Sequence, residues 1–432
     1  MKSGPTGLPA MVLHIGPHKT GTTTLQAGLG QNRASLREQG VVYPGRQNHE
    51  LNAATAVSSR TVEPGQSVET STAAWFEMLD EIRSSGARLG VLSSEFYSET
   101  PQERIEWLLE RLGSDVQVVI TLRPLASILP SQWQQYIQNR LVYPWDEWLQ
   151  AILSEPRSGK ITPTFWLRHR HDLLVRRWVE VAGRERVTVI AVDERDPEFV
   201  VRSFEELLDV VPGTLTPRDL RSNRSLALEE VELVRRFNQL YRSAGYTGTD
   251  YTTLIRYGAI RRLQEQPVAA GSHSIRLPGW AAQRAGEIAR MMVTDIIDSG
   301  VKIMGPIRDL DRSARTPADN DPAVDNPTID SVSADLAARL TVGLVETMGR
   351  YTPTRPPDPE RAPVLTAIDR RNREQRAAER RRRTESEIEA LRHKIDSVRR
   401  QIANQPLVAE ATRRDLFSEL RRRALRRLRP RR

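Results

Sequence analysis

The 432-residue chain contains no cysteine. Disulfides, thiolate metal sites and cysteine nucleophiles are therefore excluded. The sequence also lacks any run of about 18 uncharged apolar residues, the length that a membrane-spanning helix needs, and its first ten residues lack the apolar segment of a secretory signal. We therefore expect a cytoplasmic protein.

Lysine is scarce, with five residues in the whole chain, so arginine carries most of the positive charge. That charge is unevenly distributed, because residues 360–432 hold 23 Lys and Arg against 11 Asp and Glu, whereas the rest of the chain holds 41 against 44. Attraction to polyanions therefore belongs to the C-terminal segment rather than to the nearly neutral body. Against this background Lys19, which stands in a turn rich in glycine and threonine, is notable.

Short apolar runs of strand type alternate with helical patterns along the first half of the chain. The expected strands are 11–15, 89–93, 116–122 and 187–192, and the expected helices are 24–39, 73–85, 102–112, 125–139, 171–182 and 197–208. Such alternation predicts a parallel sheet covered by helices. We therefore expect an α/β fold, with a three-layer, P-loop-like domain and a central parallel sheet over residues 1–226.

We expect no further strand after residue 226. Residues 227–350 have the pattern of a mainly helical extension, interrupted by a loop rich in Pro, Asp and Asn at about 311–327. Residues 351–363 form a Pro-rich linker, and residues 364–432 a basic helical tail. Within the tail, apolar residues at 3,4,3,4 spacing predict a short coiled coil; they are Ile388, Leu391, Ile395, Val398 and Ile402.

Partners of the tail follow from this pattern. An apolar seam of little more than two heptads is marginal alone, so we expect weak self-association or packing within an oligomer. The final basic helix is suited to an anionic surface such as membrane lipid, which would make the protein peripheral to a membrane. A solvated, partly disordered extension is the alternative. We expect no specific recognition of nucleic acid.

The segment from His14 to Gln26 reads HIGPHKTGTTTLQ, a strand followed by a tight loop and a helix. Its glycines let backbone N–H groups face an anion at the helix N-terminus, which predicts a phosphate site. The Walker pattern G-x-x-x-x-G-K-[ST] fits Gly16 and Gly21, but Thr22 stands where its lysine should be, and Lys19 lies three residues earlier. A threonine-rich helix cap is the plainer interpretation.

This loop resembles the 5'-phosphosulfate loop of the sulfotransferase family. The resemblance implies that the donor is 3'-phosphoadenosine 5'-phosphosulfate, that Lys19 is the catalytic cation, and that Thr20, Gly21, Thr22 and Thr23 cradle the 5'-phosphate. The family's second element is a strand that ends in Arg, with Ser eight residues later, both holding the 3'-phosphate. Arg123 and Ser131 match this element, and the resemblance covers about residues 11–226.

The acceptor of such a reaction loses a proton, which calls for a histidine or a carboxylate beside it. Glu95 follows the expected strand 89–93, and some carbohydrate sulfotransferases are similar in using Glu. His49 lies in a polar loop, where bacterial members of the family look similar. We favour Glu95 and keep His49 as the alternative, although a helix N-terminal carboxylate and a solvated loop histidine are structural explanations for each. His18 is a weaker candidate.

We therefore expect a sulfotransferase that transfers a sulfonate to a hydroxyl or amine of a small molecule or glycan, without a metal ion. Five tryptophans could line a sugar cleft, although tryptophan at helical spacing is more often core; they are Trp75, Trp133, Trp145, Trp148 and Trp166. One alternative is a P-loop kinase or nucleotide hydrolase, which would need a lysine at position 22 and a strand-ending Asp for Mg²⁺. Another is a nucleotide-binding interaction protein without enzymatic activity.

Overall fold

The computed structural model describes residues 7–59, 62, 66–154, 161–217, 224–246, 250–311 and 326–350. All of them belong to one unit, Met1–Tyr351. The linker expected at 351–363 and the basic tail at 364–432, with its coiled coil, lie outside the described residues, as does most of the loop expected at 311–327.

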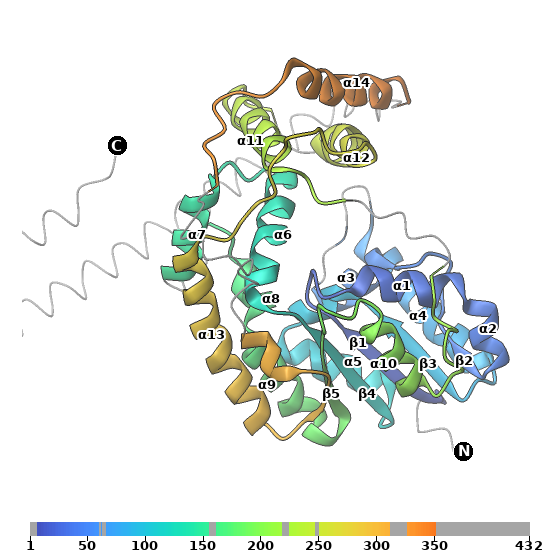
Figure 1. The fold of residues 1–432 in the computed structure, drawn as a ribbon. Helices are drawn as coiled ribbons and strands as arrows, with labels where there is room; N and C mark the ends of the chain where they lie inside the picture. The colour runs from blue at the N-terminus through green and yellow to red at the C-terminus, as the bar shows by residue number, and fades with distance from the viewer. Residues whose placement is uncertain are drawn as a thin grey trace, which may run out of the picture. The chain divides into compact units, whose positions relative to one another are not determined.

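A six-stranded sheet forms the centre of the fold, in the order β2-β3-β1-β4-β5-β6 (Figure 1). Its strands are β1 (Ala10–Ile15), β2 (Val41–Val42), β3 (Leu89–Ser93), β4 (Val116–Leu122), β5 (Val187–Ala191) and β6 (Lys302–Met304). Every neighbouring pair is parallel, which confirms the predicted α/β fold. The continuous apolar runs of β1, β4 and β5 are buried almost throughout, as expected for strands covered on both faces.

The two outermost strands correct the sequence interpretation. The expectation that strands end before residue 227 is wrong, because Lys302–Met304 pairs in parallel with Thr188–Ile190 of β5. β2 was not expected either. Each of these edge strands has three residues or fewer, which is too short to carry a hydrophobic period, so the contact with the neighbouring strand decides the structure. The boundary drawn at residue 226 stays a prediction.

Helices cover both faces of the sheet and complete three layers (Figure 1). One face packs against α1 (Thr22–Gln31), α2 (Arg33–Glu38) and α10 (Phe199–Leu208). The other packs against α3 (Leu51–Ser58), α4 (Val68–Ser84), α5 (Gln102–Leu112), α9 (His171–Ala182) and α13 (Gly279–Asp298). The single helix expected at 24–39 divides at Asn32, whose side chain donates hydrogen bonds to the carbonyls of Gly28 and Thr216.

A second core lies among helices that follow β4. They are α6 (Leu125–Gln138), α7 (Trp145–Ser154), α8 (Thr164–His169), α11 (Leu228–Ser243), the π-helix η3 (Tyr251–Ile260), α12 (Arg261–Gln264) and α14 (Ala334–Arg350). Short 3-10 helices occur at η1 (Glu95–Glu99), η2 (Arg184–Arg186) and η4 (Ile307–Asp311).

All five tryptophans considered for a sugar cleft are buried. Trp133, Trp145, Trp148 and Trp166 belong to the core of this helical part, and Trp75 belongs to the core beneath the sheet. The structure therefore supports the core interpretation of these residues. Within the described ranges, no helix combines the length and the apolar character needed to cross a bilayer.

Candidate active site

Most of the predicted site residues follow the carboxyl ends of three adjacent parallel strands. β1 pairs with β3 and with β4, and the registers set His14 beside Ser93 and Ile15 beside Ile120. The loop after β1, Glu95 after β3 and Arg123 after β4 therefore leave the sheet at one edge. In open α/β sheets this edge is where ligands bind.

The loop after β1 has a backbone that leaves little room for side chains. A Cβ at Gly16 would overlap Thr121 Oγ1 and Thr22 Cγ2, so only glycine fits there. Lys19 and Gly21 both have left-handed backbones, with φ of 73° and 88°. Such a conformation is uncommon for lysine and persists where the surroundings impose it. The loop is thus shaped by its packing, and Lys19 holds a fixed place in it.

A chain of hydrogen bonds ties this loop to the strand ends. Thr20 Oγ1 donates to the Pro17 carbonyl at 2.8 Å and therefore accepts from Thr121 Oγ1 at 2.9 Å. Thr121 Oγ1 in turn accepts from His14 Nε2 at 3.2 Å, and His14 Nδ1 accepts from Ser93 Oγ at 2.8 Å. Burial lowers the pKa of His14 to about 3, so the ring is neutral and one tautomer satisfies every bond. The Thr20 hydroxyl is consequently used inside the loop.

At the N-terminus of α1, the loop presents groups without partners. Gly21 is the N-cap of α1 and provides no side chain, and the first turn of the helix carries no acidic residue. Within the described part of the chain, the hydroxyls of Thr22 and Thr23 take part in no hydrogen bond with another residue. Free N–H groups, hydroxyls and a lysine at one helix N-terminus suit a phosphate or phosphosulfate group.

A cavity of about 330 Å³ opens beside this loop. Of the predicted residues, Lys19, Gly21, Thr22, Thr23 and Glu95 line it. The structure thus brings the loop and the favoured base together around one space.

Glu95 is the first residue of η1, the short helix that follows β3, and its carboxylate lies near His49. Its Oε2 atom accepts a hydrogen bond from Gln26 Nε2 at 3.2 Å and lies 3.7 Å from His49 Nε2. Burial by itself raises the pKa of Glu95, but nearby His49 and His18, together with hydrogen bonds from the backbone and Gln26, bring that pKa below its ordinary value. Glu95 is therefore an anion at neutral pH.

His49 lies behind Glu95 rather than on the cavity. Its Nε2 is 2.9 Å from Ser94 Oγ, and His49 is not among the residues that line the cavity. Its ring stacks on Phe96, with centroids 6.2 Å apart. His49 can therefore affect the cavity through its contact with the Glu95 carboxylate.

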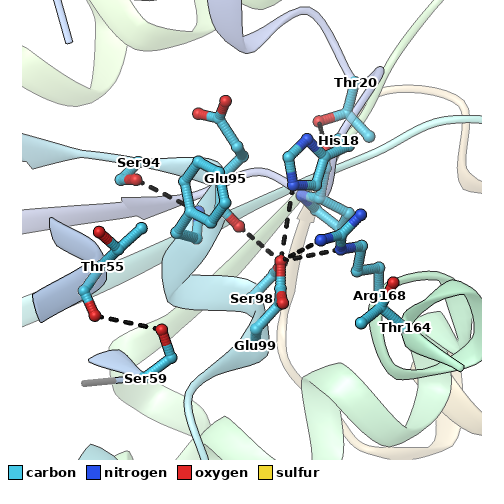
Figure 2. A network of polar contacts seen from close by, with 12 residues as sticks. His18, Thr20, Thr55, Ser59, Ser94, Glu95, Ser98, Glu99, Thr164 and Arg168 are labelled. Carbon is cyan, nitrogen blue, oxygen red and sulfur yellow. Dashed lines mark hydrogen bonds and ion pairs between the residues drawn. The ribbon is translucent and has the colours of Figure 1, made fainter. Parts of the chain in front are cut away.

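His18 faces the cavity from the loop, beside a second carboxylate. Figure 2 shows His18 and Arg168 converging on Glu99, which accepts from Arg168 Nε at 2.8 Å. His18 Nε2 is 3.6 Å from Glu99 Oε1, too far for a hydrogen bond, and is buried without a hydrogen-bond partner. Burial lowers the pKa of His18, so the ring is neutral at pH 7 and retains an unused ring nitrogen.

Lys19 lies near two arginines, Arg123 and Arg256. Burial lowers its pKa, Arg123 and Arg256 lower it further, and Glu95 opposes them. Within the described ranges, no carboxylate lies within ion-pair distance of Lys19 or Arg256. An excess of positive charge without acidic partners favours binding of an anion in this cavity.

Arg123 lies beside the loop, and its partners differ from those expected. Its Nη1 is 3.4 Å from the Lys19 carbonyl, and its Nε donates to Glu194 Oε1 at 2.7 Å. Ser131 donates instead to the carbonyl of Ile128, one turn earlier in α6, at 2.9 Å. Neither Arg123 nor Ser131 lines the 330 Å³ cavity.

The opposite wall of the cavity consists of residues that the sequence did not reveal. They come from the second half of α6, from η3 and from α12, and are Gln135, Gln138, Arg256, Tyr257, Arg261 and Gln264. No local pattern marks them, because their place in the cavity depends on how η3 and α12 pack in the folded chain. A π-helix is itself rare and often occurs at functional sites, but it leaves no periodic signal in the sequence.

Comparison with known proteins gives a structural match to a bacterial enzyme. No family model and no curated protein matches the chain. Among solved structures, the chain is similar to the crystal structure of a sulfotransferase from Alicyclobacillus acidocaldarius, with 22% sequence identity and a TM-score of 0.34. The match covers 56% of this chain and 98% of that protein. It is thus a match at low identity to a bacterial sulfotransferase, over about half of the chain.

Proposed function

We propose that this protein is a sulfotransferase that moves the sulfonate of 3'-phosphoadenosine 5'-phosphosulfate to a hydroxyl or amine acceptor. The observation that carries the proposal is the arrangement of Lys19 and Glu95. Both line one cavity of about 330 Å³, from the ends of the adjacent strands β1 and β3. The Lys19 ammonium, which has no ion-pair partner among the described residues, and the ionised Glu95 carboxylate can thus act on a substrate in the same cavity.

The loop fits the phosphosulfate of the donor in its chemistry. The uncapped N-terminus of α1 and the hydroxyls of Thr22 and Thr23 offer hydrogen bonds to phosphate oxygens. Lys19 supplies the charge. The chain from Ser93 through His14 to Thr20 keeps the loop in place before the donor arrives. Preorganised donors of this kind are the usual source of electrostatic stabilisation in a transition state.

The proposed reaction is a direct displacement at sulfur. A bond forms between the acceptor oxygen or nitrogen and sulfur, while the bond between sulfur and the bridging phosphate oxygen breaks. Lys19 stabilises the negative charge that develops on the bridging oxygen, and Glu95 takes the acceptor's proton. The nucleotide product is 3'-phosphoadenosine 5'-phosphate. No step in this scheme requires a metal ion.

The far wall of the cavity supports a polar, hydroxyl-rich acceptor such as a glycan. Gln135, Gln138 and Gln264 each offer both a donor and an acceptor, which suits sugar hydroxyls. Tyr257, which is 47% exposed and lies against the Arg256 guanidinium, is the aromatic residue of this wall, since the tryptophans are buried. A small polar molecule with the same groups would fit the same chemistry.

Binding of the product nucleotide tests this function without knowledge of the acceptor. Calorimetric titration of the full chain with 3'-phosphoadenosine 5'-phosphate should give saturable binding, weakened in Lys19→Ala. Lys302→Ala is the matched control, because Lys302 is an exposed lysine on β6, at the edge of the sheet. Absence of binding would contradict the proposed function, and turnover of ATP with Mg²⁺ would favour the kinase or hydrolase.

A further inference from the structure

In the segment after β5, the Glu194 carboxylate contacts both Arg123 and Ser127. Glu194 Oε1 accepts from Arg123 Nε at 2.7 Å, and Glu194 Oε2 accepts from Ser127 Oγ at 2.9 Å. Both oxygens of the carboxylate are therefore engaged, one by a guanidinium and one by a hydroxyl. Phosphate oxygens would accept the same two bonds, because guanidinium and hydroxyl donors recognise both anions.

Other charged residues of this segment have partners of their own. Arg195 Nε lies 3.0 Å from Asp193 Oδ1, and Arg195 Nη2 lies 3.0 Å from Asp309 Oδ2. Glu194 is thus the residue of this segment that reaches across to α6. The Arg123 and Glu194 side chains are 34% and 37% exposed, so their ion pair is weakened by water and can be displaced.

Ser127 is better placed than Ser131 to act together with Arg123. Ser127 lies in the first turn of α6 and already donates to the same carboxylate as Arg123. Ser131 lies one turn later, and its hydroxyl donates a hydrogen bond to the Ile128 carbonyl. The Ser127 hydroxyl thus points at an anion that a phosphate can replace, whereas the Ser131 hydroxyl is bound to the backbone of its own helix.

We propose that Glu194 is a specificity-determining residue that occupies the place of the donor's 3'-phosphate, between Arg123 and Ser127, and leaves when the donor binds. This inference rests on the proposed sulfotransferase function. A nucleotide with a 3'-phosphate must displace the carboxylate, whereas a nucleotide with only a 5'-phosphate need not. Return of Glu194 to Arg123 then competes with the bound product and favours its release.

The test compares two nucleotides on the full chain. Adenosine 5'-phosphate and 3'-phosphoadenosine 5'-phosphate are titrated into wild type, Glu194→Gln and Ser127→Ala by calorimetry. Glu194→Gln should tighten binding of the 3'-phosphorylated nucleotide by about two- to five-fold, the range set by an exposed ion pair, and leave adenosine 5'-phosphate unchanged. Ser127→Ala should weaken the 3'-phosphorylated nucleotide selectively, and by more than Ser131→Ala does.

Glu198→Gln is the matched control, because it removes one negative charge from the same segment at a side chain that is 81% exposed. It should change neither affinity, and thermal melting checks that each variant is folded. An unchanged affinity in Glu194→Gln, or equal tightening for both nucleotides, would overturn the role of Glu194 and leave the donor proposal standing. If neither wild type nor Glu194→Gln binds either nucleotide, both proposals fail. Binding by Glu194→Gln alone would support the displacement directly.

Discussion

Glu95 Oε2 lies 3.7 Å from His49 Nε2, so the two side chains considered as alternative bases are in contact with each other. Glu95 lines the cavity, and His49 does not. The geometry therefore favours Glu95 as the group that meets the acceptor and His49 as a positioning residue that acts through it. His49 is also one of the groups that lower the pKa of Glu95.

Replacement of these two residues should separate their roles. Glu95→Gln should reduce turnover by about 10²-fold or more, because the base is lost, while nucleotide binding persists. His49→Asn should retain activity but move the acid limb of the pH–rate profile to higher pH. The sign follows because Glu95 must be ionised, and loss of His49 removes one cause of its lowered pKa. Near-normal turnover in Glu95→Gln together with an inactive His49→Asn would assign the base to His49.

Lys19→Ala should lower turnover by about 10²- to 10³-fold, since a positioned cation acts on the charge of the leaving oxygen. Its binding of 3'-phosphoadenosine 5'-phosphate should remain measurable, because the α1 N-terminus and Thr22 are still present. Turnover and binding measured on the same preparation check this. An equal loss in both would make Lys19 a binding residue only.

The alkaline limb of the pH–rate profile should report on Lys19. Burial, Arg123 and Arg256 all lower its pKa, so activity is lost at a lower pH than for an ordinary lysine. Arg256→Gln removes one of these causes and should therefore shift the alkaline limb to higher pH. Arg308→Gln is a control, because it removes an arginine of η4, which packs near α13 and β5. The same shift in both variants would contradict a specific effect of Arg256 on Lys19.

Arg123→Ala should weaken the 3'-phosphorylated nucleotide by about ten- to a hundred-fold, the range for a hydrogen bond to a charged group, and adenosine 5'-phosphate much less. Ser131→Ala should act in the same direction but weakly, since its hydroxyl must first leave the Ile128 carbonyl. Parallel titrations with both nucleotides measure the selectivity. Equal losses for the two nucleotides would place these residues away from the 3'-phosphate.

The conformation of the loop after β1 could be predicted because it is largely local. Gly21 is required by the loop's own backbone, Gly16 is required in part by Thr20 and Thr22 of the same loop, and Lys19 is fixed by the same turn. The parallel sheet could be predicted because each long strand is a continuous apolar run. These features depend on neighbours in the sequence, and the sequence therefore reveals them.

The rest of the site depends on contacts between distant segments. Arg256 and Tyr257 line the cavity together with the distant loop after β1, and their own segment has no feature that indicates this. Glu194 stands in a charged run after β5, which by composition is typical of a solvated turn. Its contacts with Arg123 and Ser127 arise from the order of β4 and β5 in the sheet.

The basic tail can be tested by removing it. Deletion of residues 360–432 should leave nucleotide binding unchanged, because the residues that line the cavity all lie in Met1–Tyr351. The deleted segment holds 23 Lys and Arg against 11 Asp and Glu, so the full chain should sediment with anionic vesicles at low salt, and the truncated chain should not. Added salt should abolish the difference by screening. Identical behaviour of both proteins on vesicles and in size analysis would exclude both roles of the tail.

Acid should destabilise the fold through its buried histidines. Burial lowers the pKa of His14 to about 3 and that of His171 to about 4, below the ordinary value of 6.5. Below pH 6.5 these histidines therefore bind protons in the unfolded chain but not in the folded chain. The stability that the neutral rings contribute is fully present above pH 6.5 and is lost as the pH falls towards the folded pKa values. At pH 5 each histidine should cost about 2 kcal/mol of unfolding free energy relative to pH 7.5.

Urea unfolding of the full chain at pH 7.5 and pH 5.0 measures this loss. His14→Gln should be less stable than wild type at pH 7.5, because the hydrogen bonds to Ser93 and Thr121 are disturbed. It should nevertheless lose less stability between the two pH values, since the imidazole that stays neutral in the folded chain has been removed. The same loss between pH 7.5 and pH 5.0 in wild type and His14→Gln would show that His14 is not a source of the acid sensitivity. A smaller loss in the variant, with a lower starting stability, would indicate that the neutral ring holds the loop after β1 to the ends of β3 and β4.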